Sequence, residues 1–129
     1  MEKCIKSVSE FHTAFGQTQF DTPTVNANEA ELRHRLMKEE NDEYLQAVED
    51  GDLVEIADAL GDQLYILCGT ILKHGMQDII LKAFDLIHEN NMSKLGPDGK
   101  PILREDGKIL KPESYTPVDL TPLFNETRL

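Results

Sequence analysis

Residues 31–75 read ELRHRLMKEENDEYLQAVEDGDLVEIADALGDQLYILCGTILKHG, and this stretch decides the fold. Apolar residues recur at steps of three and four on both sides of Gly51, which is the pattern of amphipathic helices. Gly51 can adopt the left-handed conformation that ends a helix and lets the chain reverse. The stretch therefore predicts two consecutive helices, over about 28–50 and 53–74, joined by a short turn.

Two capping-box patterns mark where these helices start. Asn28 stands three residues before Glu31, and Asp52 stands three residues before Glu55. In such a box the first side chain accepts a hydrogen bond from an unpaired backbone N–H of the first helical turn. We therefore expect one helix to begin at Asn28 and the next at Asp52.

The sequence on either side of this stretch differs in character. Apolar residues at helical spacing over 8–15 and 77–89 predict a first and a fourth helix. Five of the six prolines lie beyond Lys94, where Asp98-Gly99-Lys100 recurs as Asp106-Gly107-Lys108. Asp-Gly pairs favour tight turns, so we expect a short hairpin there.

Together these patterns predict an all-α fold. We expect a bundle of four to five helices with an irregular C-terminal tail that contains the hairpin. The chain is predicted to form one domain over 1–129, with its helical body at about 1–93 and its tail at about 94–129. At 129 residues its length suits a single domain.

Charge is concentrated in one segment of the chain. The sequence has 24 acidic and 13 basic residues, and ten of the acids fall within 39–62, which holds no Lys or Arg. Without a basic face, the chain is not expected to bind nucleic acid. Its longest uncharged stretch has ten residues, too few to cross a membrane, and its N-terminus has no apolar signal core. We therefore expect a cytosolic protein.

Four of these acids have spacings that favour a metal site. Glu40 and Glu43 share a helical face with apolar residues, where charge is costly unless it is paired or bound to a metal. Asp58 and Asp62 are four residues apart and share a face of the next helix. If the two helices pack antiparallel, these acids converge and can bind Mg²⁺ or Mn²⁺. A solvated acidic surface is the alternative interpretation.

Several segments, taken in order, resemble one family. They are Glu10-Phe11-His12-Thr13-Ala14-Phe15-Gly16, Leu36-Met37-Lys38-Glu39-Glu40-Asn41-Asp42-Glu43, Asp58-Ala59-Leu60-Gly61-Asp62-Gln63-Leu64-Tyr65, Ile87-His88-Glu89-Asn90-Asn91-Met92-Ser93-Lys94 and Asp106-Gly107-Lys108-Ile109-Leu110-Lys111-Pro112. They resemble the all-α NTP pyrophosphatases with their EExxE…ExxD signature: MazG-like proteins, dimeric dUTPases and phosphoribosyl-ATP pyrophosphohydrolase. The chain is most similar to MazG-like proteins related to dUTPases.

The resemblance implies Mg²⁺-dependent hydrolysis of a nucleoside triphosphate to the monophosphate and pyrophosphate, with dUTP or another pyrimidine deoxynucleotide favoured. By position it implies a role for each matching residue: Glu40, Glu43 and Asp62 as metal ligands, Glu39 as the acid that holds or activates water, Asn91 and Lys94 near the sugar and phosphates, and His12 at the nucleotide pocket. Basic residues of the tail would also offset phosphate charge, and among them we include Lys111 as substrate-binding.

The sequence departs from the family signature at one position. The signature would place a Glu three residues before Asp62, where this chain has Ala59. Asp58 lies next to it, and Glu55-Ile56-Ala57-Asp58 itself spells ExxD. Either the motif has moved by one helical turn or Asp58 replaces the missing Glu. We favour Asp58 with Asp62, because Glu55 already has a capping role.

Two other classes of function remain open. The chain could be a catalytically weak or inactive nucleotide- or metal-binding module of the same fold, in keeping with Ala59. It could instead be a structural helical protein whose acids are only solvated. Four short helices with wide apolar faces also give a thin core for one subunit, so we expect a homodimer or a dimer of dimers.

Overall fold

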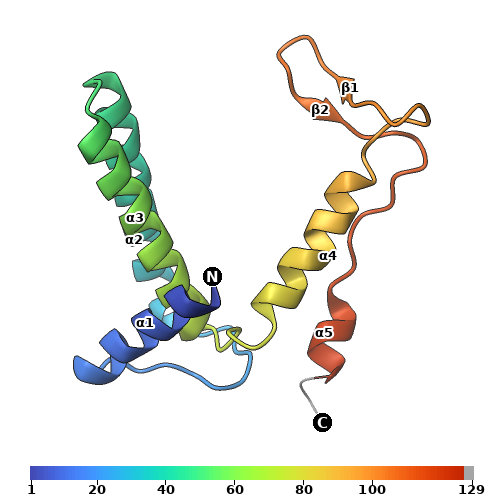
Figure 1. Ribbon diagram of the computed structural model, residues 1–129. Helices are drawn as coiled ribbons and strands as arrows, with labels where there is room; N and C mark the ends of the chain where they lie inside the picture. The colour runs from blue at the N-terminus through green and yellow to red at the C-terminus, as the bar shows by residue number, and fades with distance from the viewer. Residues whose placement is uncertain (127–129) are drawn as a thin grey trace. The chain divides into compact units, whose positions relative to one another are not determined.

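The computed structural model describes residues 1–126, and the chain divides into two units, the first ending at Asp78 and the second starting at Ile79. The elements are α1 (Glu2–Ala14), α2 (Ala27–Glu49) and α3 (Leu53–Lys73) in the first unit, then α4 (Ile80–Met92), β1 (Ile102–Leu103), β2 (Ile109–Leu110) and α5 (Thr121–Glu126) in the second (Figure 1). The predicted all-α fold with a short C-terminal hairpin is confirmed. None of the helices over 1–126 combines the length and apolar character that a membrane span needs.

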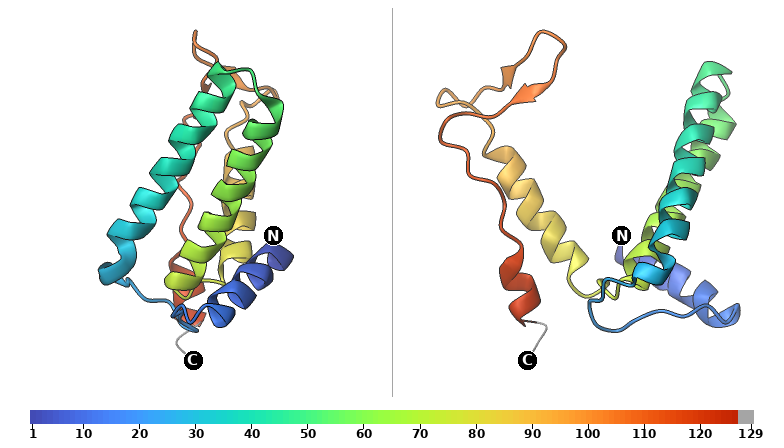
Figure 2. Two further views of the ribbon diagram at one scale, coloured as in Figure 1. Left: turned by 90° about the vertical axis from the view of Figure 1, so that its left-hand side faces the viewer. Right: turned by 180° about the vertical axis from the view of Figure 1, so that it is seen from behind.

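The pair formed by α2 and α3 is the helical hairpin that the sequence predicts. Gly51 has a φ of 66° at the turn, in the left-handed region where glycine is favoured. Arg33 on α2 donates to the Ile66 carbonyl oxygen on α3 at 2.9 Å, while Gln63 donates to Asn41 at 3.2 Å. The later residue of α2 thus bonds to the earlier residue of α3. The two helices therefore run antiparallel, side by side (Figure 2).

The two helix starts have different outcomes. Asp52 accepts a hydrogen bond from the Glu55 N–H at 3.1 Å, so the predicted cap of α3 is confirmed. The predicted start at Asn28 is wrong, because α2 already begins at Ala27. Asn26 precedes it with a φ of 45°, and its amide donates to the Lys73 carbonyl oxygen at 2.7 Å and to Glu29 at 3.0 Å. A contact with the far end of α3 thus fixes where α2 starts.

The core of the first unit lies between α1 and α3. Ile5 and Val8 of α1 are buried, as are three residues of α3, Cys68, Ile71 and Leu72. Farther along, the Phe11 ring meets the Tyr65 ring edge-on at a centroid distance of 5.7 Å. These contacts pack α1 across the C-terminal half of α3, while α2 covers another face of the same helix.

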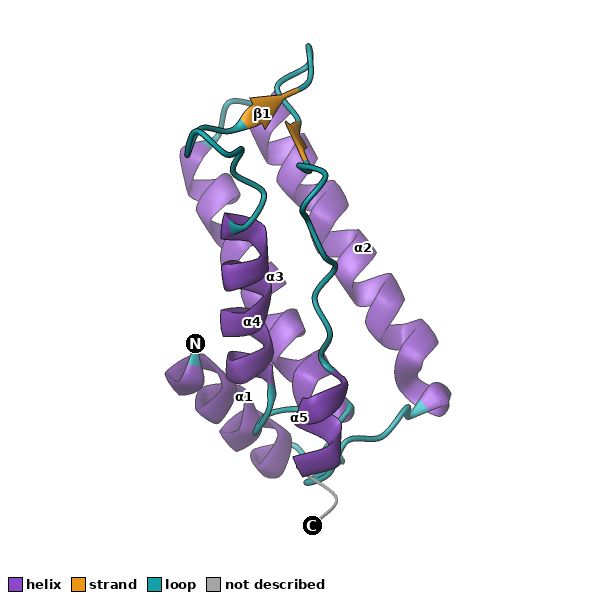
Figure 3. Ribbon diagram, turned by 90° about the vertical axis from the view of Figure 1, so that its right-hand side faces the viewer, coloured by secondary structure: helices purple, strands orange, loops and turns teal. Residues whose placement is uncertain are grey.

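The second unit consists of α4, a hairpin and α5 (Figure 3). Helix α4 begins and ends three residues later than the predicted 77–89. Strands β1 and β2 pair antiparallel, with Ile102 opposite Leu110, and the Asp106-Gly107 pair forms their turn. The segment between β2 and α5 runs back along α4, where Asn90 donates to the Thr116 carbonyl oxygen at 2.6 Å.

Candidate active site

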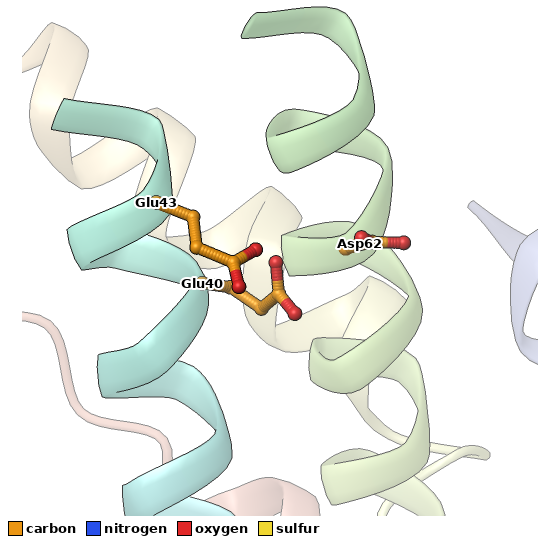
Figure 4. Close-up of side chains that lie close together, drawn as sticks. All are labelled: Glu40, Glu43 and Asp62. Carbon is orange, nitrogen blue, oxygen red and sulfur yellow. The ribbon is translucent and has the colours of Figure 1, made fainter. Parts of the chain in front are cut away.

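Three carboxylates from α2 and α3 form a cluster. Glu40 and Glu43 extend from α2 toward α3, which carries Asp62 (Figure 4). Each residue offers one carboxylate oxygen, and these three oxygens lie within 4.8 Å of one another. The structure thus brings together three of the four acids predicted as metal ligands.

Local geometry explains the cluster. A separation of three residues places Glu40 and Glu43 on one helical face, the face that also buries Ala47 against α3. The hydrogen bond between Asn41 and Gln63 joins the residues that follow Glu40 and Asp62 in sequence. This bond and those of Arg33 show the register that places the acids opposite each other.

The environment of Glu40 disfavours its charged form. Partial burial, a hydrogen bond with Glu43 and the negative charges of Glu43, Asp62 and Asp58 raise the pKa of Glu40 to about 7. Its Oε2 atom is buried and has no hydrogen-bond partner within the described chain. A buried acceptor among like charges is the setting in which a bound cation relieves the repulsion.

The donor set of this cluster fits a hard divalent cation. Carboxylate oxygens are the ligands that Mg²⁺ and Mn²⁺ prefer, and both ions keep several water molecules or phosphate oxygens as further ligands. The nearby Lys38 does not offset the charge of the cluster, since its ammonium pairs with Asp42 at 2.9 Å on the exposed side of α2. The three carboxylates therefore have the chemistry to hold one divalent cation.

Asp58 lies beside this cluster. A cavity of about 360 Å³ lies between α2 and the start of α3. The residues that line it are Glu43, Gln46, Ala47, Asp50, Glu55, Asp58 and Ala59. Asp58 acts on Glu40 through its charge. Ala59 is buried, and its methyl group offers no ligand atom. The cavity wall thus contains both acids, Asp58 and Glu55, that the sequence offers in place of the missing Glu.

Glu39 and His12 have different surroundings. Glu39 is exposed on α2, next to Glu40. His12 is only 4% exposed, and its Nδ1 lies 3.2 Å from Gln19 Oε1. Burial, and after it the positive charge of Lys73, lowers the pKa of His12, so the ring is neutral at pH 7. His12 therefore belongs to a packed polar cluster, and its predicted role at a nucleotide pocket stays a prediction.

Two further residues of this polar cluster, Lys73 and Arg33, are not among the predicted site residues. Lys73 is 2% exposed and pairs with Glu29 at 3.0 Å. Arg33 donates to Thr70 and to the Ile66 carbonyl oxygen. Lys73 stands at the end of a predicted helix, where lysine is ordinarily solvated, so nothing in the local pattern indicates its burial.

The remaining predicted site residues belong to the second unit. Asn91 is exposed near the end of α4. The ammonium groups of Lys94 and Lys111 lie 5.8 Å and 5.1 Å from the centroid of the Tyr115 ring. The structure thus places two predicted substrate residues around an aromatic ring for which the sequence predicts no role. Tyr115 lies between Pro112 and Pro117, four residues after Lys111, and no helical or strand period singles it out.

Comparisons with known proteins agree with the resemblance to the all-α NTP pyrophosphatases. The family model described as phosphoribosyl-ATP pyrophosphohydrolase matches residues 8–91, which include α2, α3 and every acid of the cluster. Among curated proteins, the chain is similar to the uncharacterized protein L479 of Acanthamoeba polyphaga mimivirus, with 31% identity over 121 residues. That match covers 88% of this chain and 45% of the relative, so the chain spans less than half of the relative's length.

Proposed function

The chain belongs to the phosphoribosyl-ATP pyrophosphohydrolase family, within the MazG-like all-α NTP pyrophosphatases, and from this we propose that it hydrolyses a nucleoside triphosphate to the monophosphate and pyrophosphate. We further propose dUTP or another pyrimidine deoxynucleotide as its substrate. The observation that carries the proposal is the cluster of Glu40, Glu43 and Asp62, because it lies on the two helices that the family model matches.

In this proposal the acids of α2 and α3 hold Mg²⁺ or Mn²⁺. Glu40, Glu43 and Asp62 supply the oxygens of the cluster, and Asp58 supplies a fourth carboxylate from the adjacent cavity wall. The bound cation would neutralise phosphate charge and stabilise the pyrophosphate leaving group. Without it, the acids would repel a triphosphate.

Glu39 has the role of the base. It lies next to Glu40 on an exposed part of α2, where a water molecule can reach it. The water oxygen forms a bond to a phosphorus of the triphosphate, the bridging P–O bond to pyrophosphate breaks, and Glu39 takes the water proton. Asn91, Lys94 and Lys111 bind the sugar and phosphates in this proposal, and His12 lines the nucleotide pocket.

We also propose that the protein works as a homodimer or a dimer of dimers. Four leucines share one face of α3 and are exposed by 39% to 81%: Leu53, Leu60, Leu64 and Leu67. An apolar face of this extent is typical of a surface that a second subunit covers. Analytical ultracentrifugation at micromolar concentration tests this, and a folded monomer would contradict it.

A pyrophosphate-release assay tests the enzymatic proposal. The purified chain is incubated with Mg²⁺ or Mn²⁺ and with dUTP, dCTP, dTTP and the ribonucleotides in turn. We expect metal-dependent release that the Glu40→Gln variant loses by at least about a hundredfold, as for other groups that stabilise transition-state charge. A folded, metal-loaded chain that binds nucleotide without releasing pyrophosphate would contradict the enzymatic proposal. The chain would then be an inactive binding module, and Ala59 would be the first explanation for the lost activity.

A further inference from the structure

Tyr115 lies where two positively charged side chains meet. The Lys94 ammonium is 5.8 Å from the centroid of its ring, and the Lys111 ammonium is 5.1 Å from it. Lys94 follows the end of α4, and Lys111 follows β2, so the ring gathers cations from two segments that are 17 residues apart in sequence. Both distances fall within the range in which the negative face of an aromatic ring attracts a cation.

Neither ammonium group is neutralised within the described part of the chain. Other basic residues form ion pairs in this part of the chain, among them Lys38, Lys73 and Arg104. Both ammonium groups lie within 5.8 Å of one ring centroid, so a polyphosphate anion that spans the ring can contact both of them. The negative face of the ring offsets part of their charge, and the anion would offset the rest.

The ring is itself held in place by α4. The Tyr115 hydroxyl donates to Asn90 Oδ1 at 2.6 Å, and the Asn90 amide donates to the Thr116 carbonyl oxygen at 2.6 Å. One asparagine thus fixes both the side chain of residue 115 and the backbone of the next residue. A ring fixed in this way presents its face in one orientation and limits the rotamers that the two lysines can adopt.

From this geometry we propose that Tyr115 is a positioning residue, which holds the ammonium groups of Lys94 and Lys111 together as one binding site for the phosphate chain of the substrate. The inference rests on the proposed function, because that function supplies the phosphate chain. Preorganised cations lower the conformational cost of binding a polyphosphate. The ring face is the essential part of Tyr115, because without the hydroxyl the bond from Asn90 to the Thr116 carbonyl oxygen still holds the segment against α4.

The direct test is calorimetry with inorganic tripolyphosphate on the full-length protein, with a chelator present so that the acidic cluster holds no metal. We expect Tyr115→Leu to weaken binding about fivefold and Tyr115→Phe to stay within about twofold of the wild type. Lys94→Gln and Lys111→Gln each weaken it as well, because both ammonium groups contact the one anion. Lys6→Gln is the charge-matched control on an exposed lysine of α1, outside the tail, and leaves binding unchanged.

Three results would overturn the inference: no tripolyphosphate binding by the wild type at millimolar concentration, unchanged binding by a folded Tyr115→Leu variant, or equal losses in the Leu and Phe variants. Circular dichroism establishes whether each variant is folded. If Tyr115→Leu unfolds, the two lysine variants decide, since a loss of binding in only one of them would mean that the two lysines do not form one site.

Pyrophosphate release by the same variants separates this inference from the proposed function. In an active enzyme, Tyr115→Leu should raise KM about fivefold and leave kcat within about twofold. A wild type that binds tripolyphosphate in the expected pattern but hydrolyses no nucleotide would refute the function and leave the site in place. An active Tyr115→Leu variant with unchanged KM would refute the site alone.

Discussion

A carboxylate oxygen of Glu40, on α2, lies within 4.8 Å of a carboxylate oxygen of Asp62, on α3. The two residues are 22 positions apart in sequence, and a hydrogen bond joins the residues that follow them, Asn41 and Gln63. Because Glu43 shares the cluster, three negative charges meet at a partly buried place. The metal-free protein should therefore carry a stability cost that depends on pH and that a divalent cation removes.

The first prediction concerns stability against pH. The pKa of Glu40 is raised from 4.5 to about 7 in the folded protein. Between these values the folded state binds more protons than the unfolded state, so the free energy of unfolding falls as the pH rises from about 4.5 to about 7. The stabilisation is complete below the lower value and lost above the higher one. Thermal unfolding in a chelator, followed by circular dichroism, measures this trend.

Glu40→Gln is the control for that trend, because it removes the titrating group and keeps the shape of the side chain. Above pH 7 the metal-free variant should be more stable than the metal-free wild type by about 1 kcal/mol, after allowance for the solvent that reaches this half-buried residue. Equal slopes against pH in the two proteins would show that another group causes the trend.

The second prediction concerns proton release on metal binding. Below pH 7 the raised pKa of Glu40 leaves the carboxyl largely protonated, and a metal ion binds only the deprotonated form. Mg²⁺ or Mn²⁺ binding at pH 6 should therefore release close to one proton, and its affinity should rise with pH and level off above about 7. Calorimetry in two buffers that differ in ionisation enthalpy counts the protons. Release of the same number at pH 8.5 would contradict the assignment to Glu40.

The sequence predicted the parts of the fold that depend on local periodicity. The apolar spacing in residues 31–75 and the glycine at 51 predicted the helical hairpin, and the Asp52 cap is present. The start of α2 was wrong because it depends on Asn26, whose amide reaches a carbonyl group 47 residues away. A contact between segments so far apart leaves no local pattern to read.

In the candidate site, too, local spacing predicted some features, whereas contacts between distant segments could not be predicted. Spacings of three and four residues predicted that acids of two helices would converge, and Glu40, Glu43 and Asp62 do lie together. The place of Tyr115 between Lys94 and Lys111 could not be predicted in this way, because it depends on how an irregular segment runs back along α4. No helical or strand period links these three residues.

The third prediction separates Asp58 from Glu55 as the replacement for the acid absent at Ala59. Asp58 acts on Glu40 through its charge, whereas Glu55 accompanies the Asp52 cap at the start of α3. Asp58→Asn should weaken Mg²⁺ binding about tenfold, and Glu55→Gln should change it by less than about twofold. A carboxylate contributes about 1 kcal/mol or more to binding only when it lies close to the bound ion. The reverse order in titration calorimetry would mean that the motif has moved by one helical turn.

The fourth prediction compares two glycines of α3. A Cβ atom at Gly69 would lie 2.6 Å from Arg33 Nη2 and 3.5 Å from His12 Nε2, whereas one at Gly61 would have no atom outside its own helix within 4 Å. Gly69→Ala must therefore displace the guanidinium that bonds to the Ile66 carbonyl oxygen, at a cost of about 1–3 kcal/mol. Gly61→Ala, the matched control, should add about 0.5–1 kcal/mol of stability, because alanine is the better helix former. Urea unfolding of the two variants measures both values, and a Gly69→Ala protein as stable as Gly61→Ala would show that Arg33 does not hold α2 against α3.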